Sequence, residues 1–115
     1  MKDYKIALLA GDGIGPEISE VTKTILGALA KKHDLIFRFN EKCFGGSAIE
    51  LTGNPLPEDT LKTCKDSNAV LLAAIGNPKF DSLPREDRPE TGLLKLRSEL
   101  GLFANIRPVK ISEAL

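Results

Sequence analysis

The feature that most constrains the fold is a strand, turn and helix signature at the start of the chain. Residues 5–10 form a compact apolar run, and the glycine-rich turn 11–15 follows it directly. Such a run is typical of a buried strand in a parallel sheet. Pro16 suits the first position of a helix, because its ring fixes φ at a helical value and its missing N–H would be unpaired there anyway. The chain therefore opens as an α/β protein.

The alternation of helices and strands continues along the chain. Residues 16–32 are predicted to be a helix, whose apolar stripe is formed by Ile18, Val21, Ile25, Leu26 and Leu29. Residues 35–40 have strand character, and residues 57–65 have the pattern of a short helix. Residues 69–75 are the most apolar run, so we expect them to form a central, buried strand.

The stretch from Arg88 to Pro108 carries the strongest indication of a ligand site. We predict a helix over residues 91–100, with Thr91 as its N-cap and Gly101 just past its end. Residues 103–109 alternate between apolar and polar side chains, which predicts a strand. A helix and a strand in succession would bring their side chains to one place.

Two arginines in this stretch are candidates for binding carboxylates. On the predicted helix Leu93 and Arg97 share one face with Leu94 beside them, and Asn105 and Arg107 lie on the same side of the predicted strand. Guanidinium groups pair bidentately with carboxylates, so this set would suit a small ligand with carboxylates and one branched apolar group. The alternative is that both arginines are ordinary surface charges.

Composition excludes several classes of function. The 115 residues, 42% of them hydrophobic and 28% charged, are typical of at most one soluble globular domain. Sixteen basic and sixteen acidic residues are spread along the chain, which argues against binding to nucleic acid or an acidic membrane. The amino-terminal apolar run is too short for a signal peptide or a membrane span. Cys43 and Cys64 lack zinc-site spacing, so we expect reduced structural thiols in a cytoplasmic protein.

Other motifs give weaker signals. Gly11 and Gly13 match the first two glycines of a dinucleotide-binding fingerprint, but Pro16 occupies the third position, so the turn indicates only that backbone approaches a phosphate or a nicotinamide ring. His33 is the only histidine, and its place at a helix end suits a charge on the helix dipole. No nucleophile and base stand at a recognisable spacing, and the candidate acids are Asp12, Glu17, Asp87 and Glu90.

Six collinear motifs together resemble one family. They are GDGIGPE at 11–17, FGGSAIE at 44–50, LPEDTL at 56–61, GNPKFD at 76–81, ETGLLKLR at 90–97 and LFANIRPVK at 102–110. They resemble the amino-terminal part of the β-decarboxylating dehydrogenases of isopropylmalate, isocitrate, homoisocitrate and tartrate, and most closely the isopropylmalate branch. The resemblance implies the amino-terminal, incomplete part of an open α/β sheet domain that is not a Rossmann fold. Residues 1–100 would belong to the first domain and residues 101–115 would begin the second.

The resemblance also implies roles for individual residues. Arg97 and Arg107 would bind the malate carboxylates, and Leu93 and Leu94 would line the pocket for the isopropyl group. A substrate with a further carboxylate, such as isocitrate, would lose hydration against leucine, so the two leucines favour isopropylmalate. The nicotinamide end of NAD would lie near Ile14, Asn77, Pro78, Lys79, Glu90 and Thr91. Asn77 stands where relatives often have a second glycine.

The implied reaction is the NAD-dependent oxidative decarboxylation of (2R,3S)-3-isopropylmalate to 4-methyl-2-oxopentanoate in leucine biosynthesis. The implied enzyme is a cytoplasmic homodimer that uses Mg²⁺ or Mn²⁺. We expect the metal ligands and the catalytic residues to lie outside these 115 residues, and the chain to be inactive by itself. Two alternatives stay open: a sister dehydrogenase for another 2-hydroxy acid, and a non-catalytic nucleotide-binding module. The choice between NAD and NADP is open as well.

Overall fold

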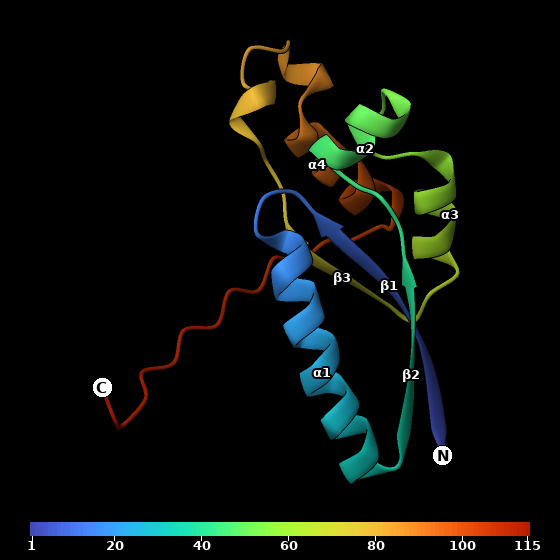
Figure 1. Cartoon of the computed structure of the whole chain (residues 1–115), viewed down its shortest axis with the longest axis vertical. Coiled ribbons are helices and arrows are strands. Elements are labelled where there is room, and N and C mark those ends of the chain that lie inside the picture. The colour runs from blue at the N-terminus through green and yellow to red at the C-terminus, as the bar shows by residue number, and fades with distance from the viewer.

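The computed structural model describes residues 1–115 and has a mixed α/β architecture, as expected (Figure 1). Its sheet contains β1 (Lys2–Gly11), β2 (Leu35–Glu41) and β3 (Ala69–Ala74). Four helices accompany the sheet: α1 (Gly15–His33), α2 (Gly46–Thr52), α3 (Glu58–Lys65) and α4 (Pro89–Glu99). Two short 3₁₀ turns, Pro78–Phe80 and Arg85–Asp87, lie between β3 and α4. In Figure 1, α1 lies on one side of the sheet, while α2, α3 and α4 gather around the other side and the carboxyl ends of the strands.

The three strands are parallel and have the order β2-β1-β3. β1 pairs with β2 from Lys2↔Leu35 to Leu8↔Glu41, and with β3 from Ile6↔Ala69 to Gly11↔Ala74. β1 is therefore the central strand, and its residues 6–9 are buried. The expectation that residues 69–75 form the central strand is wrong, because β3 lies at an edge and is only half-buried.

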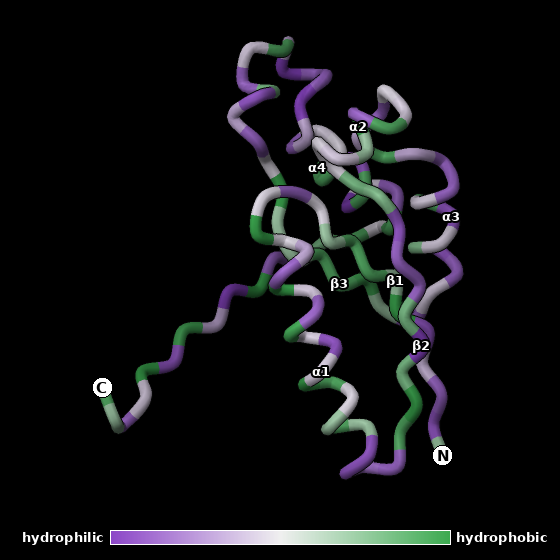
Figure 2. The backbone as a smooth tube through the Cα atoms, viewed as in Figure 1, coloured by the Kyte–Doolittle hydropathy of each residue, from purple (hydrophilic) through white to green (hydrophobic).

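The hydrophobic core lies between the sheet and the helices α2, α3 and α4. Its buried members are Ala7, Leu9, Phe44, Leu56, Cys64 and Leu96. Since side chains alternate along a strand, Ala7 and Leu9 lie on this face, and Ile6 and Leu8 point to the face that α1 covers. Figure 2 shows hydrophobic segments along β1 and β3, beneath the more hydrophilic α2, α3 and α4. Both cysteines are free thiols, and burial raises the pKa of the Cys64 thiol.

Helix α1 forms as predicted, but its apolar stripe is not buried against the sheet. The side facing the sheet carries Gly15, Ser19 and the half-buried Leu26. Ile18, Val21, Ile25 and Leu29 point outward with 40–58% of their surface exposed. The helix can lie close to the sheet because Gly15 has no side chain: a Cβ there would come within 1.8 Å of the Ala10 carbonyl oxygen.

No helix of the structure is both long and apolar enough to cross a membrane.

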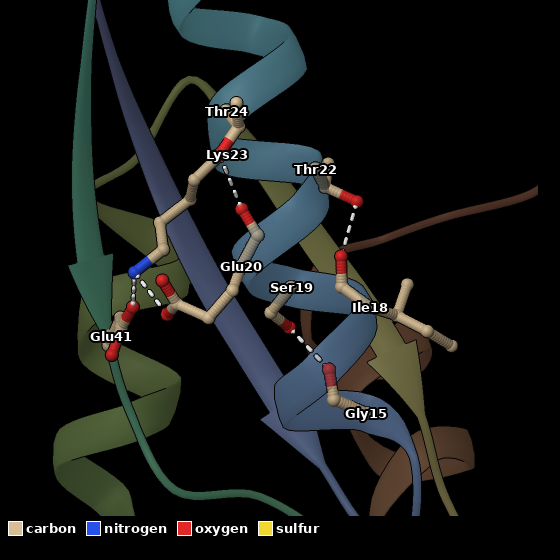
Figure 3. A network of polar contacts seen from close by, with 8 residues as sticks. All are labelled: Gly15, Ile18, Ser19, Glu20, Thr22, Lys23, Thr24 and Glu41. Atoms are coloured by element: carbon tan, nitrogen blue, oxygen red, sulfur yellow. Dashed lines mark hydrogen bonds and ion pairs between the residues drawn. The ribbon is translucent and has the colours of Figure 1, made fainter.

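A lysine of α1 forms an ion pair with a glutamate of the neighbouring strand β2, as Figure 3 shows. Lys23 Nζ lies 2.6 Å from Glu20 Oε1 on the same helix and 2.6 Å from Glu41 Oε1 at the end of β2. The hydrogen bond to Glu20, followed by that to Glu41, raises the pKa of the Lys23 ammonium above its ordinary value. The pairs contribute little stability, because they are exposed to solvent.

The last part of the chain differs from the prediction in two ways. α4 begins at Pro89 with Arg88 as its N-cap residue, so Thr91 is not the N-cap; proline at the first helical position is already held at a helical φ. Gly101 ends the helix region with φ 65°, as expected. Residues 103–109 form no strand and are exposed throughout, because their alternating pattern has no neighbouring strand with which to form hydrogen bonds.

Candidate functional site

One buried carboxylate joins the carboxyl ends of β1 and β3. Asp12 is 5% exposed. Its Oδ2 accepts hydrogen bonds from the N–H groups of Gly46 at 2.8 Å and Gly76 at 2.9 Å, and its Oδ1 accepts one from Ser47 at 2.8 Å. The N–H of Asp12 itself donates to the carbonyl of Ala74 at 3.0 Å. Three segments that are far apart in the sequence therefore meet at one side chain.

The local sequence makes room for this carboxylate. Gly45 is the N-cap residue of α2 and has no side chain to cap the helix, so Asp12 accepts the first free N–H groups in its place. A Cβ on Gly45 would lie 2.8 Å from Asp12 Oδ2, and its φ of 71° also favours glycine. Sequence reasoning treated Asp12 only as one candidate acid among four. The paired glycines at 45 and 46 were a signal of close approach, but they do not indicate to what.

The predicted cofactor segment leaves β3 directly after this junction. Asn77 Oδ1 accepts the N–H of Lys79 at 2.9 Å and so caps the turn Pro78–Phe80. Lys79 Nζ pairs with Glu50 Oε1 on α2 at 2.7 Å. Phe80 is buried, and its ring lies against Gly46, where an added Cβ would come within 2.6 Å of it. The three predicted residues 77–79 are thus held at both ends rather than projecting as a free loop.

Three other predicted cofactor residues lie near the exit of β3 or at the same edge of the sheet. Glu90 Oε1 is close to Gly76, since a Cβ on that glycine would lie 3.1 Å from it. Ile14, two residues after Asp12, exposes 65% of its surface. Thr91 is half-buried, and its hydroxyl donates to the carbonyl of Arg85. This edge of a parallel sheet is where open α/β proteins bind their ligands.

The predicted substrate residues of α4 are divided between two sides of the helix. Leu96 lies in the core, and Leu93 packs against the core from a half-buried position. Glu90, Leu94 and Arg97, spaced by four and three residues, lie on the outer face. Leu94 is 59% exposed, so it offers more apolar surface to a ligand than Leu93 does.

Arg97 stands beside an open hollow of about 420 Å³. The rest of its lining comes from the segment after α4, namely Leu102, Phe103, Ala104, Asn105 and Ile106. Arg107 does not line the hollow; its Nε lies 3.5 Å from Asn105 Oδ1. Neither Arg97 nor Arg107 forms an ion pair within residues 1–115. The structure thus gathers Arg97 with Asn105 and leaves Arg107 outside, and an unpaired guanidinium beside apolar surface can bind a carboxylate.

The chain's one histidine lies away from this edge. No group of three His, Cys, Asp or Glu side chains lies close enough to hold a metal ion. His33 is the last residue of α1, and α1 begins at the carboxyl edge of the sheet and runs back along it to the start of β2 (Figure 1). His33 therefore lies at the opposite end of the sheet from Asp12.

Comparisons with known proteins agree with this architecture. The profile of the isocitrate/isopropylmalate dehydrogenase family matches residues 5–115. The chain is 69% identical over 115 residues to a 3-isopropylmalate dehydrogenase of Prochlorococcus marinus, covering 100% of this chain and 32% of that protein. It is 64% identical over 110 residues to the enzyme of the same name from Synechococcus elongatus, covering 96% of this chain and 30% of that protein. The chain thus spans about a third of the length of these relatives.

Solved structures show the same fold. A β-decarboxylating dehydrogenase from Thermococcus kodakarensis in its apo form superposes with a TM-score of 0.66 at 33% identity, over 87% of this chain and 27% of that one. An isocitrate dehydrogenase from Methylococcus capsulatus superposes with a TM-score of 0.58 at 28% identity, over 65% of this chain and 21% of that one. With the family profile matching residues 5–115, the chain belongs to the isocitrate/isopropylmalate dehydrogenase family.

Proposed function

We propose that the whole protein to which this chain belongs catalyses the NAD-dependent oxidative decarboxylation of (2R,3S)-3-isopropylmalate to 4-methyl-2-oxopentanoate, a step of leucine biosynthesis. The observation that carries the proposal is the 69% identity, over the whole chain, with a protein named 3-isopropylmalate dehydrogenase. Since the chain spans 32% of that relative, the activity is proposed for the whole protein. Residues 1–115 contribute binding surfaces to it.

The outer face of α4 supports isopropylmalate as the substrate. Arg97 has no carboxylate partner in the chain, so its guanidinium is free to pair with a carboxylate of the substrate. Leu94 precedes Arg97 by three residues and lies on the same face of α4, and Leu93 is the residue directly before Leu94. We propose that the leucines contact the isopropyl group and that Arg97 and Arg107 bind the malate carboxylates. A further carboxylate placed against Leu94 would lose hydration without gaining a partner, which disfavours isocitrate.

The exit of β3 supports binding of the nicotinamide end of NAD. Ile14 offers apolar surface for the ring, and the Glu90 carboxylate beside Gly76 offers an acceptor for an amide N–H. Residues 77–79 and Thr91 complete the proposed contacts. When bound, NAD would accept a hydride from the carbon that carries the 2-hydroxyl group, and the resulting 2-keto acid would lose its 3-carboxylate as CO₂. The residues of this chain would orient the two reactants relative to each other.

The remaining proposals concern the whole protein. We propose that it is a cytoplasmic homodimer that uses Mg²⁺ or Mn²⁺, and that residues 101–115 begin its second domain. We propose that the metal ligands and the catalytic residues of the whole protein lie outside residues 1–115.

A hybrid enzyme tests the proposed function. Residues 1–115 would replace the matching segment of the Prochlorococcus marinus relative, to which they are 69% identical. We expect the hybrid to form NADH with 3-isopropylmalate and to form little with isocitrate or tartrate at equal concentration. Preference for isocitrate or tartrate would refute isopropylmalate as the substrate and favour a sister dehydrogenase. Failure to oxidise any of these substrates, in a hybrid that is folded and binds NAD, would favour the non-catalytic module.

A further inference from the structure

We infer that Asp12 is a positioning residue, whose carboxylate holds the two proposed walls of the nicotinamide site at a fixed separation. The inference rests on the proposed function for the part that concerns NAD. Asp12 directly follows β1 and would act through the backbone of other segments rather than by touching the cofactor. Three backbone hydrogen bonds converge on this one side chain.

The burial of Asp12 makes these hydrogen bonds obligatory. The side chain is 5% exposed and has no ion-pair partner among the chain's salt bridges. A buried carboxylate without a cation is costly unless donors surround it. Here the donors are the N–H groups of Gly46, Ser47 and Gly76, at 2.8, 2.8 and 2.9 Å. The three segments must therefore stay together, since moving any one of them would leave the buried carboxylate of Asp12 without one or more of its hydrogen-bond donors.

These donors belong to the elements that carry the proposed cofactor contacts. Gly76 immediately precedes residues 77–79, so Asp12 fixes the start of that segment directly. At its far end Lys79 pairs with Glu50 on the protein surface, and Glu50 lies on α2, whose N-terminus Asp12 caps. Ile14 follows Asp12 by two residues in the β1–α1 turn. Both walls of the proposed site, Ile14 and residues 77–79, thus share one anchor.

Replacing the carboxylate by an amide of the same shape tests the anchor. Asp12 Oδ2 accepts two bonds and Oδ1 accepts one, whereas asparagine has one acceptor oxygen and one NH₂ donor. Whichever way the amide turns, at least one backbone N–H faces another donor. Asp12→Asn should therefore loosen α2 or the exit of β3 without emptying the space. Cys64→Ala is the matched control, because it weakens the core from α3 and contacts neither wall.

Hydrogen exchange gives a readout that does not depend on activity. In the hybrid enzyme, Asp12→Asn should speed the exchange of amides in residues 45–52 or 75–80 roughly tenfold relative to the parent, the size expected for one lost charge-assisted bond. Cys64→Ala should not speed these segments selectively. Should Asp12→Asn fail to fold, Ser47→Pro deletes one donor in a first helical turn that tolerates proline, with Ser47→Ala as its control. Exchange in these segments that is no faster than in the controls would overturn the inference.

Steady-state kinetics then connects the anchor to the cofactor. We expect Asp12→Asn to raise KM for NAD roughly tenfold and to leave KM for isopropylmalate within about twofold, while Cys64→Ala changes neither. Equal changes in both KM values, or an unchanged KM for NAD, would overturn a positioning role toward the cofactor. If the unmutated hybrid oxidises no isopropylmalate, the proposed function fails, and hydrogen exchange still decides whether Asp12 holds the two segments.

Discussion

Gly92 lies where α4 packs against the segment after α2, and a methyl group added there would collide with Pro55. A Cβ on Gly92 would lie 2.9 Å from the Cβ of Pro55 and 3.3 Å from its carbonyl carbon and oxygen. The obstacle is a closed ring and backbone, neither of which can rotate away as a flexible side chain can. Gly92→Ala therefore forces α4 or the Pro55 segment to shift.

Two opposing effects set the size of the change. Alanine is favoured over glycine inside a helix by about 1 kcal/mol, whereas overpacking of a well-packed site costs about 1–3 kcal/mol. We therefore expect Gly92→Ala to lower the free energy of unfolding by about 0–2 kcal/mol. Gly27→Ala in α1 is the matched control: nothing lies within 4 Å of its added Cβ. That change should raise the free energy of unfolding by about 0.4–1 kcal/mol.

Urea unfolding followed by circular dichroism compares the two variants with the parent. The unmutated protein and both variants should show the same dependence of the unfolding free energy on urea concentration, so that differences in the urea midpoint report differences in stability directly. Gly27→Ala should shift the midpoint upward, and Gly92→Ala should leave it unchanged or shift it downward. An equal upward shift in both variants would refute the reasoning, because it would mean that α4 does not pack against Pro55 as described.

Three further predictions test other parts of the structure. Leu94→Arg in the hybrid enzyme should raise the ratio of isocitrate to isopropylmalate turnover at least tenfold, since a cation replaces apolar surface on the outer face of α4. Alkylation of the native chain should label Cys43 before Cys64, because Cys64 is 3% exposed and burial raises the pKa of its thiol; equal labelling rates, measured by mass spectrometry, would contradict that burial. The hydrogen bond from Lys65 lowers the pKa of Glu99. The interaction therefore stabilises the fold fully above the unfolded-state pKa of Glu99, and this stabilisation is lost as the pH falls through the folded-state pKa. Glu99→Gln should accordingly flatten the acid limb of a plot of Tm against pH.

The succession of elements could be predicted because each of its signals is local. Apolar runs predicted β1 and β3, the strand character of residues 35–40 predicted β2, and helical spacing predicted α1, α3 and α4 within a few residues of their observed ends. Gly101 ends the α4 region as expected, with a positive φ. Thr91 was the weaker choice of N-cap, because Pro89 two residues earlier already suits the first helical position.

The pairing of strands could not be predicted, because it depends on contacts between distant segments. The apolar run 69–75 indicates burial but does not state on which side of β1 the strand lies, and it lies at the edge. Residues 103–109 have a strand pattern and no neighbouring strand. The stripe of α1 is similar: its spacing predicts a helix with an apolar face, but the residues turned toward the sheet include Gly15 and Ser19.

The candidate site shows the same division. The predicted residues Ile14, Glu90 and 77–79 lie at the carboxyl edge of the sheet, because each of them follows or faces the end of a parallel strand. The role of Asp12 was not predicted, since its three donors lie 34, 35 and 64 residues further along the chain. A buried carboxylate of this kind has no local pattern, and only the folded chain shows what it holds together.

The central claim is that the outer face of α4 binds the carboxylates of isopropylmalate through Arg97. The most direct test is KM for isopropylmalate in the hybrid enzyme with Arg97→Leu, compared with Lys95→Leu, which removes an equal charge from the same helix. Loss of a charge-assisted bond of about 1.5–3 kcal/mol corresponds to a rise in KM of roughly 10- to 150-fold for Arg97→Leu. Lys95→Leu should stay within about threefold of the parent. Equal effects of the two substitutions would contradict the account, because Arg97 would then act only as a surface charge.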